Sequence, residues 1–361
     1  MLKKVKALLF LPNFYMGGAE KVTMNMIRAI DTASFELHIV VLSKEGFLYS
    51  LLPQNITLHI LESRKVMLSI FKLRTLIKEI APDLIYSTLF RTHIALEIAL
   101  CGLKERPKTI YRNPTSPKLV IAERRISFLE LICLKIVYNR ATLVISQTPE
   151  MKEEIAQYFH VKEEKIEIFI NPLDTVLIKK EIANIENPFC TSSINVVSVG
   201  RLAKEKAFDV LLYAFKLVVQ ENRKFMLHLI GRDAGEKDSL VNIIKKLGIE
   251  ENVKFWGEQM NPYRFYVFSD LYVMSSIREG LPNTILENLY LKKPIVATKC
   301  IPFMNQLIDH GNNGFLVEVG NIQQLADAIL NFENLSGKGN DVLIYHSDAN
   351  ELFLKVAKTK L

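Results

Sequence analysis

The sequence has few cysteines and no long hydrophobic run, and both shortages exclude classes of protein. No C-x-x-C pair occurs in the 361-residue chain, and its four cysteines stand singly, at Cys101, Cys133, Cys190 and Cys300. This spacing favours neither a zinc site nor a disulfide framework, and it indicates the reduced thiols of a cytosolic protein. No apolar run approaches the ~18 residues of a membrane-spanning helix. The short apolar segment over 7–12 lacks a cleavage site, so we interpret it as a strand and not as a signal peptide.

Glycine and proline are not enriched either, at 15 and 13 residues. Their usage gives no sign of a long disordered region. The length predicts two domains, and a hydrophobic content of 49% is enough for sizeable cores.

Acidic residues are scarce relative to basic ones in the first half of the chain. Residues 1–170 hold 24 Lys and Arg against 17 Asp and Glu, whereas the remainder has 22 of each. Such a basic excess suits nucleic acid, anionic lipid or a phosphorylated acceptor. Because no nucleic-acid-binding motif accompanies it, we favour lipid or a lipid phosphate.

Short apolar segments alternate with helical patterns along the chain. In the first half the candidate strands are 7–11, 36–42, 57–60, 84–87, 108–111, 143–146 and 166–168. In the second half they are 194–199, 225–230, 253–256, 271–274, 294–298 and 314–317. This alternation predicts an α/β fold with parallel sheets covered on both faces. Ligands of such sheets bind outside the carboxyl ends of the strands, so the residues that follow each strand are the candidate site residues.

The segment 278–284 follows one of these strands and opens a helix that we predict over 283–291. Gly280 permits an unusual turn, and Pro282 suits the first helical position. The N–H groups and dipole at such a helix start favour a phosphate. Glu279 and Glu287 lie on either side of this positive end and are acceptors for sugar hydroxyls. The alternative is a capped surface helix with ordinary glutamates, which this segment alone does not exclude.

Two further strand-end segments carry groups that suit a diphosphate. After the 194–199 strand, Arg201 offers a guanidinium fork and Lys206 a point charge. After the first strand, Gly17 and Gly18 let the backbone approach a ligand closely. The alternative for the two glycines is a simple tight turn into a helix.

In order along the chain, these three segments resemble the family-four retaining glycosyltransferases. The shared features are Gly-Gly-Ala-Glu at 17–20, Gly-Arg-Leu at 200–202 with a lysine five residues after the arginine, and Glu-Gly-Leu-Pro at 279–282 with a second glutamate eight residues after the first. The resemblance covers roughly residues 5–330. It implies the GT-B fold, two Rossmann-like domains that face each other across a cleft. We expect an acceptor-binding domain over 1–171, a nucleotide-sugar-binding domain over 172–335, and a tail over 336–361 whose helix packs back on the first domain.

The resemblance also implies roles at the donor site. Glu279 would hold a hydroxyl of the donor sugar, and Glu287 would hold the ribose. Arg201 and Lys206 would neutralise the leaving diphosphate, together with Gly17, Gly18, Gly280, Leu281, Pro282, Asn283 and Thr284. The nucleobase would contact the loops at Gly231, Arg232 and Gly257. No Asp-x-Asp cluster accompanies these motifs, so we expect no metal or other cofactor. The expected donor is UDP-N-acetylhexosamine or a UDP-hexose.

On the acceptor side, many relatives carry a histidine in the loop after the strand at 84–87. Here that position holds Thr88, which we expect to contact the acceptor, and His93 follows five residues later. His93 is therefore either a catalytic residue or a helix residue with a satisfied ring. Arg112 and Asn113 follow the next strand and could hold an acceptor phosphate or hydroxyl.

Basic amphipathic segments over 64–80 and 118–140 suit a membrane interface and a lipid-linked saccharide acceptor. The alternative is that both are ordinary helices that cover the sheet.

Other functional classes stay open. A sugar-nucleotide epimerase on the same fold would bind the donor without an acceptor, and a phosphorylase would need a phosphate or cofactor site that the sequence does not display. A non-enzymatic membrane-surface protein would explain the basic helices but not the donor-site residues. A nicotinamide dehydrogenase is disfavoured because no G-x-G-x-x-G follows either leading strand. We therefore predict a bacterial glycosyltransferase of surface-polysaccharide biosynthesis, peripheral on the cytoplasmic face of the inner membrane.

Overall fold

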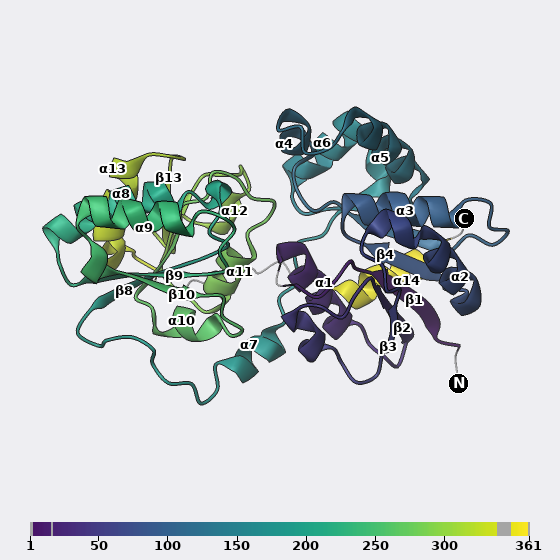
Figure 1. The fold of residues 1–361 in the computed structure, drawn as a ribbon, viewed down its shortest axis with the longest axis horizontal. Helices are drawn as coiled ribbons and strands as arrows, with labels where there is room; N and C mark the ends of the chain where they lie inside the picture. Colours follow the sequence, from purple (N-terminus) through teal and green to yellow (C-terminus); the bar gives the residue numbers. More distant parts are fainter. Residues whose placement is uncertain (1–2, 16, 338–347, 360–361) are drawn as a thin grey trace. The chain divides into compact units, whose positions relative to one another are not determined.

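The computed structural model describes residues 3–15, 17–337 and 348–359. These residues divide into two compact units (Figure 1): those within 1–174 and 345–361 form unit 1, and those within 175–344 form unit 2. Each unit is built on its own parallel sheet, so each is described by itself.

Unit 1 holds a seven-stranded sheet in the order β3-β2-β1-β4-β5-β6-β7. All its neighbouring strands are parallel, with Val5 of β1 opposite Phe35 of β2 and Ala7 opposite Leu84 of β4. The predicted strands of this half are all present, with ends within one or two residues. Their bounds are β1 Val5–Phe10, β2 Phe35–Val41, β3 Thr57–Ile60, β4 Leu84–Ser87, β5 Lys108–Arg112, β6 Leu143–Ser146 and β7 Ile166–Ile168.

Helices cover both faces of this sheet. Alternate strand residues point to opposite sides, and the side chains on both sides are apolar. Ala7 and Leu9 join a core with α1 and α14, whereas Leu8 and Phe10 join a core with α2, α3, α5 and α6. The helices are α1 Gly18–Ala29, α2 Ile70–Ile80, α3 Phe90–Leu100, α4 Pro117–Ala122, α5 Phe128–Arg140, α6 Pro149–Phe159 and α14 Ala349–Lys358, with short 3-10 turns η1 Phe47–Leu51, η2 Val66–Ser69 and η3 Glu163–Lys165.

The expectation of one helix over 118–140 is wrong. The chain breaks after α4, where Arg124 adopts a left-handed backbone at φ 52°. Ser127 then caps α5: its side chain accepts from the backbone N–H of Glu130, whose carboxylate accepts from Ser127 in return. This capping box starts a new helix, so the basic stretch before it lies in an exposed turn.

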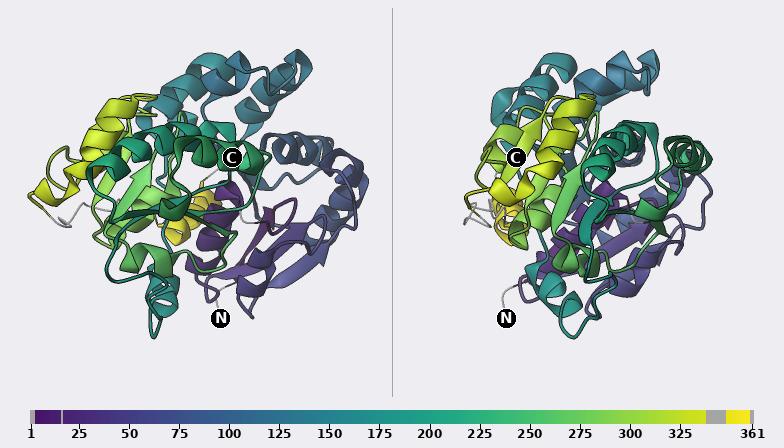
Figure 2. Two further views of the ribbon diagram at one scale, coloured as in Figure 1. Left: turned by 60° about the vertical axis from the view of Figure 1, so that its left-hand side comes forward. Right: turned by 90° about the vertical axis from the view of Figure 1, so that its left-hand side faces the viewer.

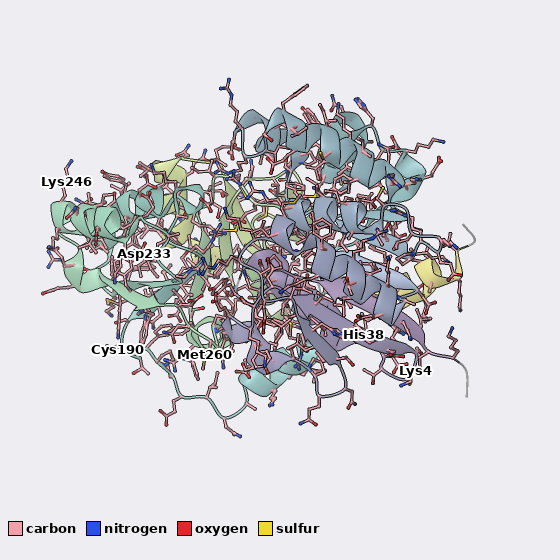
Figure 3. All side chains as sticks on the ribbon, turned by 45° about the vertical axis from the view of Figure 1, so that its right-hand side comes forward. Lys4, His38, Cys190, Asp233, Lys246 and Met260 are labelled. Atoms are coloured by element: carbon pink, nitrogen blue, oxygen red, sulfur yellow. The ribbon has the colours of Figure 1, made fainter. Side chains whose placement is uncertain are left out.

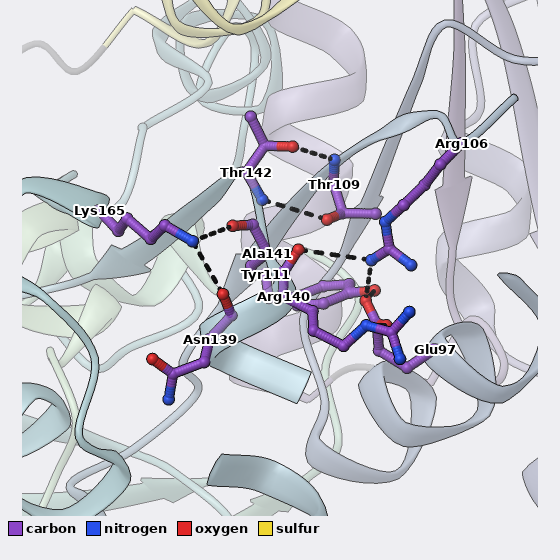
Figure 4. Close-up of polar contacts among 9 residues, drawn as sticks. All are labelled: Glu97, Arg106, Thr109, Tyr111, Asn139, Arg140, Ala141, Thr142 and Lys165. Carbon is purple, nitrogen blue, oxygen red and sulfur yellow. Dashed lines mark hydrogen bonds and ion pairs between the residues drawn. The ribbon is translucent and has the colours of Figure 1, made fainter. Parts of the chain in front are cut away.

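A polar network around the buried carboxylate of Glu97 lies at the amino ends of β5 and β6 (Figure 4). Glu97 of α3 accepts hydrogen bonds from Arg106 Nη2 at 2.5 Å and from the hydroxyl of Tyr111 at 2.8 Å. Arg140 approaches the second carboxylate oxygen of Glu97 at 3.6 Å. Burial, and then the charge of Glu97, raise the pKa of Tyr111 well above its usual value, so this tyrosine stays a donor.

The C-terminal helix α14 belongs to unit 1. Leu352, Phe353 and Val356 are buried in the core that α1 lines, and the ring of Phe353 lies 5.8 Å from that of Tyr86. Lys108 at the start of β5 donates to the carbonyl of Ala357 at 2.7 Å.

Unit 2 holds a six-stranded parallel sheet in the order β10-β9-β8-β11-β12-β13. Its strands are β8 Ile194–Val199, β9 Phe225–Ile230, β10 Val253–Gly257, β11 Leu271–Met274, β12 Ile295–Thr298 and β13 Gly314–Val317. Helices α8, α9 and α13 pack on one face and complete its apolar core (Figure 2). The helices are α7 Thr175–Glu181, α8 Phe208–Glu221, α9 Lys237–Leu247, α10 Tyr263–Phe268, α11 Asn283–Tyr290, α12 Met304–Leu307 and α13 Ile322–Leu330, with η4 Lys204–Lys206, η5 Glu250–Asn252 and η6 Phe332–Asn334.

No helix within the described part of the chain is both long enough and apolar enough to cross a bilayer.

Candidate functional site

The carboxyl ends of β8, β9 and β10 bring three predicted donor loops of unit 2 to one edge. Gly231, at φ 150°, lies so close to Gly200 that an added Cβ would be 1.8 Å from the carbonyl oxygen of Gly200. The N–H of Gly231 donates to the carbonyl of Gly257 at 2.8 Å, and the N–H of Gly200 donates to that of Ile230 at 2.9 Å. Only glycine fits at position 231, because both the space and the φ exclude a side chain.

The loop after β9 continues through Arg232, which is exposed, to a tight turn at Asp233 (Figure 3). The Asp233 carboxylate accepts three backbone N–H groups, from Gly235 at 2.8 Å and from Glu236 and Lys237 at 3.2 Å each. These bonds, that from Gly235 first, lower the pKa of Asp233. The turn therefore fixes the backbone that follows Arg232.

The central contact at this edge joins two residues far apart in sequence. Lys206 Nζ lies 2.5 Å from Glu279 Oε1, and the same oxygen accepts from the hydroxyl of Ser276 at 2.7 Å. The hydroxyl of Ser275 donates to the carbonyl of Lys206 at 2.8 Å, so the loop after β11 holds both ends of Lys206. A lysine, a carboxylate and a hydroxyl thus meet ahead of α11.

The start of α11 agrees with the predicted helix, but Pro282 precedes the first helical position instead of occupying it. The helix begins at Asn283, and Pro282 is the N-cap residue at ψ 106°, with no side-chain cap at this end among the described residues. Gly280, Asn283 and Thr284 are half-buried there, and Leu281 is buried. The positive end of the α11 dipole therefore lies beside the Lys206–Glu279 pair.

Glu287 lies one turn further along α11 and is only 1% exposed. Burial, and then the charge of Glu287, raise the pKa of Tyr266 well above its usual value. Burial also raises the pKa of Tyr272. The Glu287 carboxylate is therefore buried near the phenol groups of Tyr266 and Tyr272.

Arg201 forms an ion pair separate from the Lys206–Glu279 pair. Its guanidinium is half-exposed and contacts Glu205 Oε1 at 2.8 Å, on the next turn of the same loop. Arg201 and Lys206 therefore lie in one loop but hold different carboxylates.

Sequence reasoning missed two residues of this site, Ser276 and Cys300. Burial, and then Glu279, raise the pKa of the Cys300 thiol to about 12, so the thiol stays protonated near the ion pair. Both residues follow strands at the carboxyl edge, β11 and β12, and that position was the signal available in the sequence.

The corresponding edge of unit 1 contains the two glycines. Gly17 is the N-cap of α1 and Gly18 its first residue. A Cβ added to Gly17 would lie 2.2 Å from Glu20 Oε2. The Glu20 carboxylate therefore folds back over the start of its own helix, where a negative charge is favourable.

The predicted acceptor residues of unit 1 are internal. Arg112 is 2% exposed, and it donates from Nη1 to Thr88 Oγ1 at 3.0 Å and from Nη2 to Asn171 Oδ1 at 2.6 Å. Asn113 is buried and accepts from the hydroxyl of Tyr138 at 3.0 Å. Burial lowers the pKa of Arg112. These side chains tie β4, β5 and the segment after β7 together beneath the surface.

His93 is fully buried in α3, with its ring 4.7 Å from that of Tyr111. Burial lowers the pKa of His93 to about 3, so the ring is neutral at physiological pH. Its position is in the core of unit 1 rather than in an open loop.

Among the residues that the structure describes, no group of three or more His, Cys, Asp or Glu is arranged to hold a metal ion.

Both halves of the chain match glycosyltransferase family models. Residues 16–177 match the model described as Glycosyltransferase Family 4, and residues 180–345 match the model described as Glycosyl transferases group 1.

Proteins with similar sequences are also named glycosyltransferases. An uncharacterized glycosyltransferase of Methanocaldococcus jannaschii is 28% identical over 65% of this chain and 60% of its own length. One of Haemophilus influenzae is 33% identical over 52% of this chain and 47% of its own. The chain thus spans about half to three-fifths of these two relatives. The N-acetylgalactosamine-N,N'-diacetylbacillosaminyl-diphospho-undecaprenol 4-alpha-N-acetylgalactosaminyltransferase of Campylobacter jejuni is 26% identical over 87% of this chain and 86% of its own.

Solved structures share the fold. HepE of Anabaena, in complex with UDP and glucose, superposes with a TM-score of 0.80 at 21% identity, over 99% of this chain and 100% of that one. TarM of S. aureus, in a complex that contains UDP, superposes with a TM-score of 0.77 at 13% identity, over 98% and 100%. The predicted α/β class and GT-B fold are confirmed.

Proposed function

Because this chain belongs to the glycosyltransferases of family 4 and group 1, we propose that it moves a sugar from a nucleotide diphosphate sugar to a hydroxyl group, with retention of anomeric configuration. The observation that carries the proposal is the meeting of Lys206, Glu279 and Ser276 ahead of α11. This edge of unit 2 combines a cation, a helix dipole and sugar-hydroxyl acceptors within one loop cluster.

In the proposed reaction the bond between the anomeric carbon and the diphosphate oxygen breaks, and the acceptor oxygen bonds to the same face of that carbon. The diphosphate leaves with the electron pair and takes up the acceptor proton. Lys206, Arg201 and the start of α11 neutralise the developing charge, without a metal, and groups in such positions typically contribute ~3–4 kcal/mol. Glu279 holds a hydroxyl of the donor sugar, Glu287 holds the ribose, and the backbone at Gly231, Arg232 and Gly257 holds the base.

The proposed donor is a UDP-sugar, UDP-N-acetylhexosamine or UDP-hexose. Support comes from the structures of HepE with UDP and glucose and of TarM with UDP. The relative from C. jejuni is named for transfer of N-acetylgalactosamine, which adds support for the amino sugar.

The proposed acceptor is a lipid-linked saccharide of bacterial polysaccharide biosynthesis, bound while the protein lies peripherally on the cytoplasmic face of the membrane. The C. jejuni relative is named for a diphospho-undecaprenol-linked acceptor. The basic excess of residues 1–170 and the exposed apolar side chains of α2 and α5 support the same acceptor class.

Thermal shift with a panel of nucleoside diphosphates, in the presence of a chelator, tests the donor site. UDP at a hundredfold excess over its Kd should stabilise unit 2 by ~2.7 kcal/mol. Arg201→Ala should lose the shift, whereas Arg223→Ala, which removes another exposed arginine of unit 2, should keep it. No shift with any diphosphate contradicts the proposal, and conversion of the UDP-sugar to its epimer without acceptor would favour an epimerase.

A further inference from the structure

Two pockets of unit 1 lie side by side at the carboxyl edge of its sheet and share Pro12 in their walls. The polar pocket, of about 440 Å³, is lined by Asn13, Ser43, Glu45, Glu62 and Arg64, among others. The apolar pocket, of about 390 Å³, is lined by Val66, Leu89, Phe90, Ile94 and Ile126, with Arg91 and Arg125 beside them. Neither pocket contains the buried residues Thr88, Arg112 and Asn113.

The polar pocket is built by three loops that bond to one another. The N–H of Phe14 donates to the carbonyl of Glu45 at 2.8 Å, and the hydroxyl of Tyr15 donates to Glu45 Oε2 at 2.6 Å. The N–H of Ser63 donates to the carbonyl of Leu42 at 3.3 Å. Carboxylates, an amide and hydroxyls on a fixed frame are the groups that recognise sugar hydroxyls.

Glu62 in this pocket has a left-handed backbone at φ 47°. A residue other than glycine rarely adopts this conformation, and such strain gathers at functional sites. Glu62 is exposed and lines the polar pocket just after β3.

The apolar pocket has basic groups in its walls. Arg91 contacts Glu130 Oε1 at 3.0 Å, and Arg125 contacts Glu123 Oε2 at 2.7 Å. A diphosphate offers each guanidinium a second anionic partner of matching geometry. Apolar walls and neighbouring arginines together suit a phosphate attached to a hydrocarbon chain.

The helices on either side of the apolar pocket carry large apolar side chains that face solvent. Leu68 and Phe71, from η2 and α2, are 70% and 84% exposed, and Phe128 and Leu129, at the start of α5, are 78% and 70% exposed. Across the segments 64–72 and 124–136 there are six basic residues and one acidic residue. This combination favours an anionic bilayer surface.

From this arrangement we propose that the two pockets form one acceptor groove for a diphosphate-linked isoprenoid saccharide. The polar pocket holds the saccharide, the apolar pocket holds the diphosphate and the first isoprenoid units, and the four exposed apolar side chains enter the bilayer interface. The inference rests on the proposed transferase function and names the acceptor site of unit 1, which the sequence motifs had placed on Thr88, Arg112 and Asn113.

Calorimetric titration of the full chain with farnesyl diphosphate tests the apolar pocket. Ile126→Ser should weaken binding about tenfold, as expected for loss of one buried aliphatic side chain. Val176→Ser, which removes an exposed valine of α7 in unit 2, should leave it unchanged. No binding of farnesyl diphosphate, equal binding by Ile126→Ser, or equally tight binding of inorganic pyrophosphate would each overturn the apolar pocket.

A second probe, farnesyl diphosphate that carries N-acetylglucosamine, tests the polar pocket. It should bind more tightly than farnesyl diphosphate alone, and Glu62→Gln should remove the difference while farnesyl diphosphate binding stays unchanged. Equal affinities of the two probes for the wild-type protein would overturn the saccharide pocket.

Sedimentation with phosphatidylcholine vesicles, with and without phosphatidylglycerol, tests the bilayer contact. Binding should need the anionic lipid, fall with added salt, and drop about tenfold in Phe71→Ser and again in Phe128→Ser. A concentration-dependent dimer that either substitution abolishes would instead assign this face to a second copy of the chain and overturn the bilayer contact.

The experiments can refute the acceptor groove and the donor site independently. UDP binding without farnesyl diphosphate binding would leave the donor function intact and remove the groove, and the reverse result would remove the donor function.

Discussion

Glu279→Gln is the sharpest test of the donor chemistry, because it removes a charge and keeps the shape of the side chain. Glu279 Oε1 lies 2.5 Å from Lys206 Nζ and accepts from Ser276 at 2.7 Å, in a largely buried position. A hydrogen bond to a charged group contributes about 1.5–3 kcal/mol. The substitution therefore removes the charge that holds Lys206 and replaces the charged acceptor proposed for the donor sugar with a weaker, neutral one.

The two consequences have opposite signs. The affinity for UDP should stay constant or rise by up to about tenfold, ~1.4 kcal/mol, because Lys206 no longer shares its charge with a carboxylate. Turnover should fall by about 100- to 1,000-fold, ~3–4 kcal/mol, because an interaction made in the transition state is lost. Calorimetry with UDP measures the first effect, and UDP release from the donor sugar measures the second.

A matched control exists on the same unit. Glu318→Gln breaks the exposed Lys299–Glu318 pair, whose N–O distance is 2.7 Å, and should change neither quantity. Wild-type turnover in Glu279→Gln would refute the role of the carboxylate in transfer. A parallel fall of UDP affinity and turnover would show that Glu279 acts only by holding Lys206.

Three further predictions concern stability. Gly231→Ala should lower the free energy of unfolding in urea by more than the ~1 kcal/mol expected for Gly248→Ala, because an added Cβ at Gly231 would be 1.8 Å from a backbone oxygen whereas one at Gly248 would meet no atom within 4 Å; equal losses would contradict the packing of the two loops. Glu97→Ala should cost ~1.5–3 kcal/mol by urea unfolding, because Arg106 and Tyr111 lose their buried charged acceptor, and a loss below ~1 kcal/mol would contradict that role. Burial lowers the pKa of His93 to about 3 in the folded protein, so the unfolded chain binds this proton first as the pH falls. The contribution of His93 to the free energy of unfolding is therefore fully present above pH 6.5 and falls as the pH drops toward 3. The loss should be ~2 kcal/mol at pH 5 relative to neutral pH, and His93→Leu should flatten that part of the pH profile of unfolding.

The strands could be predicted from the sequence because their apolar runs are short and bounded. The segments 194–199, 225–230, 271–274 and 314–317 agree with the observed strands to the residue. Both faces of these sheets are covered, so buried residues occupy successive positions of a strand rather than alternate positions. The helix break after Ala122 was missed because Ser127 and Glu130 were not weighed as a capping box.

The carboxyl edges of the sheets could also be predicted, but the direction of each side chain there could not. Arg112 and Thr88 lie at strand ends as expected. However, Asn171, from a distant part of the chain, accepts a hydrogen bond from the Arg112 guanidinium, which stays buried in unit 1. In the same way, Lys206 meets Glu279 only because the loops after β8 and β11 adjoin. Contacts between such loops depend on residues far apart in sequence, which local patterns do not encode.

The position of α14 has a consequence for the order in which the chain folds during synthesis. Unit 2 is continuous in sequence, so it leaves the ribosome with every residue of its own core. Unit 1 emerges first, but α1 alone covers only part of the sheet face around Phe35 and Tyr86 until Phe353 of α14 arrives. Part of this apolar sheet face of the first half therefore stays open to water and to chaperones until the second half has been translated.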